Sequence, residues 1–202
     1  MLSSLSLNFS DSKNWVKSLS KVCIYITLII IVLIPRGLSD NYQLGKALGV
    51  GSLFSFLITT IPGTIRRFEL KGIWRKIQVI LTYSRAQWGI LMFLLASSHY
   101  YIVFIYPYVS IGQRPTIQLF TAVSAIAFYL AFPLFVTSNT WSKKRLKRNW
   151  QKLHNLTYLI IWLIFLHVAL IGELLLTIII LATAVLQICS FIFSYLKQKS
   201  SP

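Results

Sequence analysis

The stretch Leu153–Ile171 reads LHNLTYLIIWLIFLHVALI and holds two histidines in an otherwise apolar run. A helix rises 1.5 Å per residue, so a run of this length crosses a hydrocarbon core about 30 Å thick. We therefore expect a membrane-spanning helix that carries His154 near one end and His167 deep in its interior.

Further apolar runs surround this one in the chain. Only 12% of the 202 residues are charged and 56% are hydrophobic, which is too little charge for the surface of a soluble domain. We predict an all-α integral membrane bundle of six transmembrane helices. The other five spans are Leu19–Ile34, Leu44–Ile61, Trp88–Tyr108, Ile117–Val136 and Leu174–Tyr195.

The expected domain organisation is simple. A cytoplasmic N-terminal segment covers residues 1–18, a single transmembrane domain covers 19–196, and a cytoplasmic tail covers 197–202. The first span follows a basic segment and could pass for a signal peptide. No small-residue cleavage site follows it, so we expect an uncleaved anchor.

The charge distribution predicts the orientation. The chain has twenty basic residues against four acidic ones, a net charge of +16. Six alternating spans place all the basic residues on one side of the membrane except Arg36, Lys46 and Arg114. The positive-inside rule then puts both termini in the cytoplasm. The mixed basic and apolar loop after Arg66 predicts a short amphipathic helix on the membrane surface, and the basic loops could also dock an acidic reductase or bind a flavin phosphate.

Several function classes find no support in the sequence. No Gly-rich phosphate loop is present, so a Rossmann or P-loop nucleotide site is not expected. The four acidic residues form no paired-carboxylate pattern. Cys23 and Cys189 lie apart within apolar runs, where cysteine usually acts as a small packing residue.

The three histidines are the candidate site. Ionisable groups within a span are costly and suggest a function, although a single one could be a hydrogen-bonded histidine between helices. His99 and His167 lie about 20 Å and about 22 Å from the cytoplasmic ends of two spans that run in the same direction. Two imidazoles at one level can hold heme iron as axial ligands inside a helical bundle.

The same rise per residue places a second pair of residues at an inner level, nearer the cytoplasmic side. His154 lies about 20 Å below His167 along the helix, so the two cannot bind the same iron. Arg85 lies at the matching height on the third span. Because a protonated guanidinium cannot ligate iron, Arg85 is expected to pair with a porphyrin propionate or a flavin phosphate. It could instead be an interfacial anchor.

These residues resemble the ferric-reductase-like transmembrane family, and within it the MsrQ (YedZ) branch of heme-binding membrane subunits. The family pattern is T-S, a basic cluster, W-x-x-L-H-x-x-x-Y, and a second histidine thirteen residues after the first. The resemblance covers about residues 82–170. One departure is Lys147 after Leu146, where the family often has glycine. The matching elements are Thr137-Ser138, Lys144-Arg145, Trp150 to Tyr158, His167, and Ser84-Arg85 with His99 on the third span.

The resemblance implies a function. His99, His154 and His167 would be heme-associated, with heme iron bound by His99 and His167, a second heme at His154, and Arg85 in place of an inner histidine. The cofactor would be one or two b-type hemes, and FMN is allowed as well. Electrons would pass from a cytoplasmic flavin reductase or membrane quinol to a periplasmic molybdenum-cofactor sulfoxide reductase, across a bacterial inner membrane.

Two alternatives stay open. The first is a transmembrane cytochrome of ferric- or oxygen-reductase type that acts on its acceptor directly. The second is a non-redox membrane transport or scaffold protein whose histidines are structural. In the preferred interpretation the chain is an electron-transfer subunit without a nucleotide domain, so it requires a partner.

Overall fold

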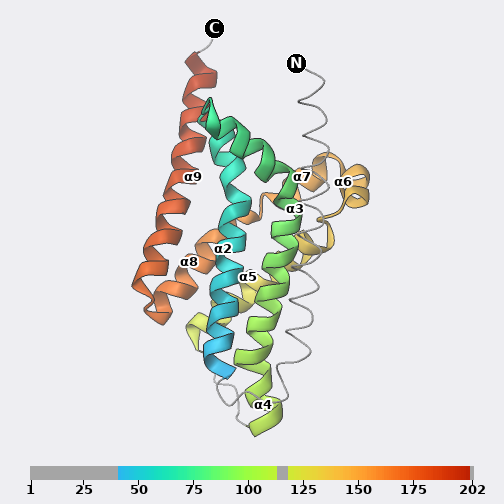
Figure 1. Ribbon diagram of the computed structural model, residues 1–202, viewed down its shortest axis with the longest axis vertical. Helices are drawn as coiled ribbons and strands as arrows, with labels where there is room; N and C mark the ends of the chain where they lie inside the picture. The colour runs from blue at the N-terminus through green and yellow to red at the C-terminus, as the bar shows by residue number, and fades with distance from the viewer. Residues whose placement is uncertain (1–40, 113–117, 201–202) are drawn as a thin grey trace. The chain divides into compact units, whose positions relative to one another are not determined.

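The computed structural model describes residues 41–112 and 118–200, and all regular elements of these two ranges are helices (Figure 1). These residues form two compact units. One contains residues 41–59 and 79–112, and the other contains residues 60–78 and 118–200. The all-α prediction is confirmed for this part of the chain.

The first unit pairs two antiparallel helices. Its elements are the first part of α2 (Asn41–Arg67), most of α3 (Ile73–Tyr100), the π-helix η2 (Tyr101–Ile105) and α4 (Tyr106–Ile111). The hydroxyl of Ser52 donates to the carbonyl of Met92 at 2.9 Å, and Leu48 packs against Ile102. These contacts fix the register of α2 against α3, and the two helices run side by side in Figure 1.

The second unit is built on the C-terminal helices. After the end of α2 it contains α5 (Leu119–Val136), α6 (Thr140–Leu146), α7 (Arg148–His154), α8 (Thr157–Ile171) and α9 (Leu174–Ser200). Helix α8 packs against both α5 and α9. Its core residues Ile160 and Ile161 are almost fully buried, as is Ile180 of α9. Gly172, with a φ of 87°, ends α8 and lets the chain turn back into α9 (Figure 1).

Five helices within the described ranges are long and apolar enough to cross a membrane. They are Tyr42–Arg67, Ile73–Val109, Leu119–Val136, Arg148–Ile171 and Leu174–Ser200. Large apolar side chains on their outer faces are exposed, including Leu174 and Leu175 at 73% and 71%. Apolar outer faces on apolar helices of this length suit contact with lipid. The predicted first span, Leu19–Ile34, lies outside the described residues.

The segment predicted to form a short surface helix after Arg66 is not a separate helix, and its placement on the membrane surface stays a prediction. Helix α2 continues to Arg67, and the chain turns through residues 68–72, where Glu69 and Gly72 adopt positive φ values of 53° and 64°. Helix α3 then starts at Ile73 and runs without interruption to Tyr100. No proline lies between these ends, so nothing separates the mixed basic segment from the apolar span that follows it.

The candidate span Arg148–Ile171, which contains the predicted fifth span, has a tight turn near the end that the sequence predicts to be cytoplasmic. Helix α7 ends at His154 and α8 begins at Thr157. Between them the backbone hydrogen bonds span three residues in place of four. The amides of Leu156 and Tyr158 donate to carbonyls three residues back at 3.0 Å. Such a tight turn changes the angular register of the helix. His154 and His167 are therefore not related by the rotation of one ideal helix.

Candidate functional site

His99 lies in the last turn of α3, facing α2. Its Nδ1 is 2.7 Å from the carbonyl oxygen of Gly45. A carbonyl only accepts, so the imidazole donates from a protonated Nδ1. In the neutral ring this places the lone pair on Nε2.

The approach of His99 to α2 depends on two glycines. A Cβ placed at Gly49 would lie 2.9 Å from His99 Nδ1, and one at Gly45 would lie 2.5 Å from Val103 Cγ2. Both positions are one helical turn apart, so they share one face of α2. Small residues at this spacing are a common means of bringing membrane helices close together.

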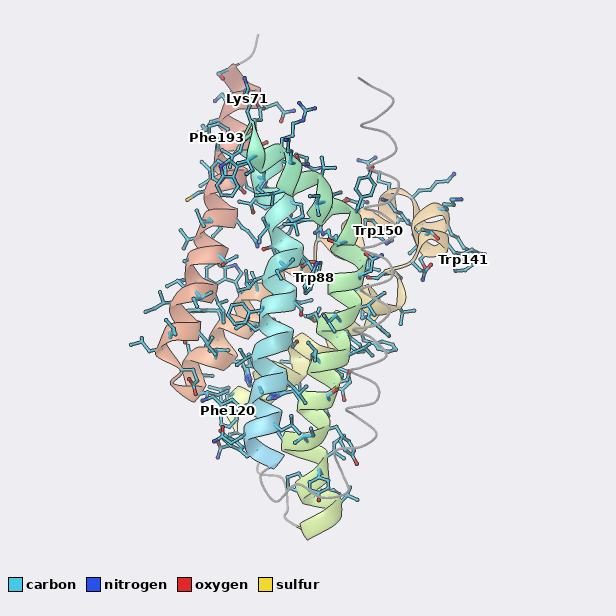
Figure 2. All side chains as sticks on the ribbon, in the orientation of Figure 1. Lys71, Trp88, Phe120, Trp141, Trp150 and Phe193 are labelled. Atoms are coloured by element: carbon cyan, nitrogen blue, oxygen red, sulfur yellow. The ribbon has the colours of Figure 1, made fainter. Side chains whose placement is uncertain are left out.

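His167 lies in α8 and makes the equivalent contact in the second unit. Its Nδ1 is 2.9 Å from the carbonyl oxygen of Phe120 at the start of α5. The Phe120 ring also lies near the imidazole, with centroids 6.1 Å apart and planes tilted by 48°. Phe120 is labelled in Figure 2. His167 therefore shares with His99 a protonated Nδ1 held by a main-chain carbonyl.

His154 is held differently. Its Nε2 lies 3.2 Å from the hydroxyl of Thr137. That hydroxyl lies 2.6 Å from the carbonyl of Pro133 and donates to it. The hydroxyl has a single proton, which it donates to the Pro133 carbonyl. The Thr137 oxygen therefore accepts a hydrogen bond from His154 Nε2. A side-chain hydroxyl thus contacts His154, whereas a main-chain carbonyl accepts from each of the other two histidines.

Trp150 completes the surroundings of His154. The two rings stack with centroids 3.9 Å apart and planes 25° from parallel. The Trp150 indole donates to the carbonyl of Thr137 at 2.9 Å, and the Lys143 ammonium lies 5.3 Å from the indole centroid. Figure 2 labels Trp150 and also the exposed Trp141 of α6. The cluster connects the C-terminal end of α5 to α7.

Arg85 lies on α3, fourteen residues before His99, and is partly buried. At 1.5 Å per residue this is about 21 Å along the helix, and the rotation returns it to within about 40° of the same face. Arg85 and His99 therefore lie on similar faces of the continuous helix α3. The predicted role of Arg85 beside a propionate or phosphate remains a prediction.

Arg67 is surrounded by a polar cluster that was not expected from the sequence. Its Nε donates to the hydroxyl of Ser190 at 2.7 Å and its Nη1 donates to the hydroxyl of Tyr158 at 3.1 Å. The guanidinium also lies 3.9 Å from the centroid of the Phe191 ring. The Ser190 hydroxyl in turn donates to the carbonyl of Gln187 at 2.7 Å. Arg67 therefore attaches the end of α2 to α8 and α9. The polar residues Gln187 and Ser190 within the apolar sequence of α9 could have indicated such a cluster.

The two histidines that donate from Nδ1 fit the protein's part in holding a heme. Within residues 41–112 and 118–200, no three His, Cys, Asp or Glu side chains gather as a metal cluster. A porphyrin supplies four nitrogen ligands itself and needs only axial ligands from the protein. Histidines whose Nδ1 is held by a carbonyl are oriented as metal-ligating histidines usually are. His99 lies in one unit and His167 in the other, so their pairing at one level remains a prediction.

Comparisons with known proteins find relatives that are named as heme-binding subunits. No family model matches the chain, and no solved structure matches it. It is 38% identical over 122 residues to the protein-methionine-sulfoxide reductase heme-binding subunit MsrQ of Rhizobium meliloti (strain 1021), covering 56% of this chain and 50% of that protein. The proteins of the same name from Brucella ovis and Brucella canis are each 32% identical over 122 residues, with the same coverage.

The chain spans about half the length of the curated relatives it matches. These relatives confirm the resemblance that the histidine motifs predicted. This chain is similar to curated proteins that are named as MsrQ, the heme-binding subunit of protein-methionine-sulfoxide reductase.

Proposed function

We propose that this chain is a heme-binding membrane subunit that carries electrons to a methionine sulfoxide reductase catalytic subunit. In this proposal His99 and His167 would hold the iron of a b-type heme. Support comes from the names of the relatives and from the helices long enough to cross a membrane.

One observation carries the proposal. Both histidines donate from Nδ1 to a main-chain carbonyl of a neighbouring helix, at 2.7 Å to Gly45 and 2.9 Å to Phe120. A histidine with a purely structural role can use either nitrogen, but an axial ligand needs a neutral ring with one nitrogen carrying the lone pair. The same nitrogen is held in both residues, so both rings have the same tautomer.

The bound heme supplies one-electron chemistry at iron. The protein contributes the surroundings. The carbonyls of Gly45 and Phe120 orient the two imidazoles and increase their basicity as ligands. Hydrogen bonding of this kind tunes a reduction potential.

An inner level is part of the proposal. His154, fixed between Trp150 and Thr137, is the candidate residue for a second heme, and Arg85 is the candidate partner of a propionate or a flavin phosphate. An electron donor on the cytoplasmic side, either a flavin reductase or a membrane quinol, would deliver electrons to this level. The acceptor would be a periplasmic molybdenum-cofactor sulfoxide reductase, with the chain in the bacterial inner membrane.

A visible spectrum tests the proposal. The purified protein should show a b-type α-band on reduction with dithionite, and a heme-to-protein ratio should give one or two hemes per chain. His99→Ala and His167→Ala should each remove one and the same heme. Ser97→Ala is the matched control on α3, because the Ser97 hydroxyl only bonds to the carbonyl of Phe93 within its own helix.

Two results would count against the proposal. A colourless wild-type protein would favour the scaffold alternative. Wild-type heme content in both histidine variants would show that other residues ligate the iron. The partner is tested separately: adding methionine sulfoxide should oxidise the reduced protein only when the catalytic subunit is present. Oxidation without that subunit would favour a cytochrome that acts on its acceptor directly.

A further inference from the structure

Gly49 of α2 lies against the ring of His99. We propose that Gly49 is a positioning residue: its lack of a side chain leaves room for the orientation in which the His99 imidazole donates to the Gly45 carbonyl. The heme measurements below rest on the proposed function, whereas the stability measurements do not. Neither residue spacing nor the resemblance identifies this contact, because the two residues come from different helices.

The geometry leaves no room for a side chain at Gly49. A Cβ there would lie 2.9 Å from His99 Nδ1, 3.1 Å from Cε1 and 3.3 Å from Cγ. The first distance is shorter than real Cβ contacts allow, and the other two are unusually tight. Three of the five ring atoms are involved, so a small rotation of the imidazole does not remove the conflict.

The ring also has little freedom to move away. Its Nδ1 is bonded to the carbonyl of Gly45 at 2.7 Å, four residues before Gly49 on the same face of α2. Gly45 is itself packed tightly, because a Cβ there would lie 2.5 Å from Val103 and 3.3 Å from Ile102. Ile102 is 4% exposed and packs against Leu48, so separating the two helices would expose this apolar contact to the surroundings.

The contact has a consequence for ligand chemistry. A strong Nδ1–H bond to a carbonyl increases the basicity of the other ring nitrogen. A more basic ligand stabilises ferric over ferrous iron and lowers the reduction potential. If a methyl group at Gly49 displaces the ring, the bond to Gly45 weakens. Heme affinity should then fall by about 10- to 100-fold, the usual cost of losing an outer-shell partner.

The chain offers a matched control on the same helix. A Cβ at Gly51 would meet only Leu95 Cδ1, at an ordinary contact distance of 3.4 Å. Gly51→Ala therefore makes the same chemical change two residues from Gly49 without touching the imidazole. Both substitutions improve helix propensity by about 1 kcal/mol, so propensity cannot distinguish them.

The experiment compares Gly49→Ala with Gly51→Ala in the full-length protein. Gly49→Ala should weaken heme binding by the stated factor, change the low-spin heme signal in electron paramagnetic resonance, and raise the potential of any heme retained. Gly51→Ala should match the wild type in all three. The proposal is overturned if the two variants behave alike.

A double-mutant cycle covers the case in which Gly49→Ala destabilises the whole protein. In a His99→Ala background the methyl group meets no imidazole, so Gly49→Ala should no longer lower the melting temperature. An equal loss in both backgrounds would indicate general packing damage and would contradict a positioning role. If the wild type bound no heme, the proposed function would fail, but coupling in this cycle would still establish the contact.

Discussion

His167 on α8 donates a hydrogen bond from Nδ1 to the main-chain carbonyl of Phe120 on α5, at 2.9 Å. The acceptor belongs to the backbone and not to the phenylalanine side chain. The orientation of the imidazole therefore depends on how α5 and α8 pack, and these two helices are in direct contact in the second unit.

Substituting the Phe120 side chain should therefore spare the heme. In Phe120→Leu the carbonyl remains and only a ring 6.1 Å from the imidazole is lost, so heme content should stay within about twofold of the wild type. His167→Ala should abolish the heme that it binds. Pyridine hemochrome assays on both variants measure this. Equal heme loss in the two variants would show that the aromatic ring, not the carbonyl, sustains the site.

His154→Ala should leave the heme bound by His99 and His167 in place. His154 is engaged through Nε2 by Thr137 and stacked on Trp150, whereas the other two histidines are held at Nδ1. The variant should lose at most a second heme, seen as a lower heme-to-protein ratio with a surviving b-type α-band. Loss of all heme from this variant would contradict a model with two separate levels.

Thr137→Val should alter the His154 level alone. Valine has nearly the same shape as threonine but cannot accept from His154 Nε2 or donate to the carbonyl of Pro133. We expect a shifted spectrum or potential for any heme at His154, and a stability loss of about 1 kcal/mol for each lost bond. Thr137→Ser keeps the hydroxyl and is the matched control. Identical spectra and melting temperatures for Thr137→Val and the wild type would remove Thr137 from the site.

The sequence predicted the helices well where an apolar run ends at polar residues. The expected span Leu174–Tyr195 begins where α9 begins, at Leu174, and the expected span Ile117–Val136 ends where α5 ends, at Val136. Length and hydropathy are sufficient for such boundaries. They fail at the beginning of α3, because the basic segment from Ile73 continues the same helix that later becomes apolar.

The surroundings of the histidines could not be predicted in the same way. His99 contacts Gly45 and Gly49 across a gap of about 50 residues in sequence, through the relative register of α2 and α3. No periodicity within either helix determines that register. The turn at Asn155 and Leu156, between His154 and His167, depends on backbone hydrogen bonds between residues three apart. Neither residue is a strong helix breaker, so the sequence does not indicate this turn. Only tertiary packing distinguishes these features.

Lys147→Gly should stabilise the protein. Lys147 joins α6 to α7 with a φ of 47° and a ψ of −116°, close to a turn position that favours glycine. A side chain in such a conformation costs roughly 1 to 3 kcal/mol. Relief of that cost should exceed the entropy cost of glycine, with a net gain of about 1 kcal/mol. Thermal unfolding measures the change. Lys144→Gly, inside α6, should instead lower stability, and a decrease for Lys147→Gly as well would refute the assignment of strain.

Arg67→Gln should destabilise the second unit far more than Arg66→Gln. Arg67 donates to Ser190 and Tyr158 and lies 3.9 Å from the Phe191 ring centroid, whereas Arg66 is exposed. Hydrogen bonds from a charged group contribute about 1.5 to 3 kcal/mol each, before discounting for partial exposure, and a cation over an aromatic ring adds about 0.5 to 2 kcal/mol. After that discount we expect a loss of about 2 to 3 kcal/mol for Arg67→Gln, against less than about 0.5 kcal/mol for Arg66→Gln.

Both arginine variants lose one positive charge from the same end of α2, so an effect on membrane orientation would be common to both. The difference between their melting temperatures therefore isolates the contacts of Arg67. Ser190→Ala removes one acceptor and should reproduce part of the loss, and adding it to Arg67→Gln should cost little more because the two share a bond. Fully additive losses would mean that Arg67 and Ser190 stabilise the second unit independently, and that the end of α2 is attached to α9 by other contacts.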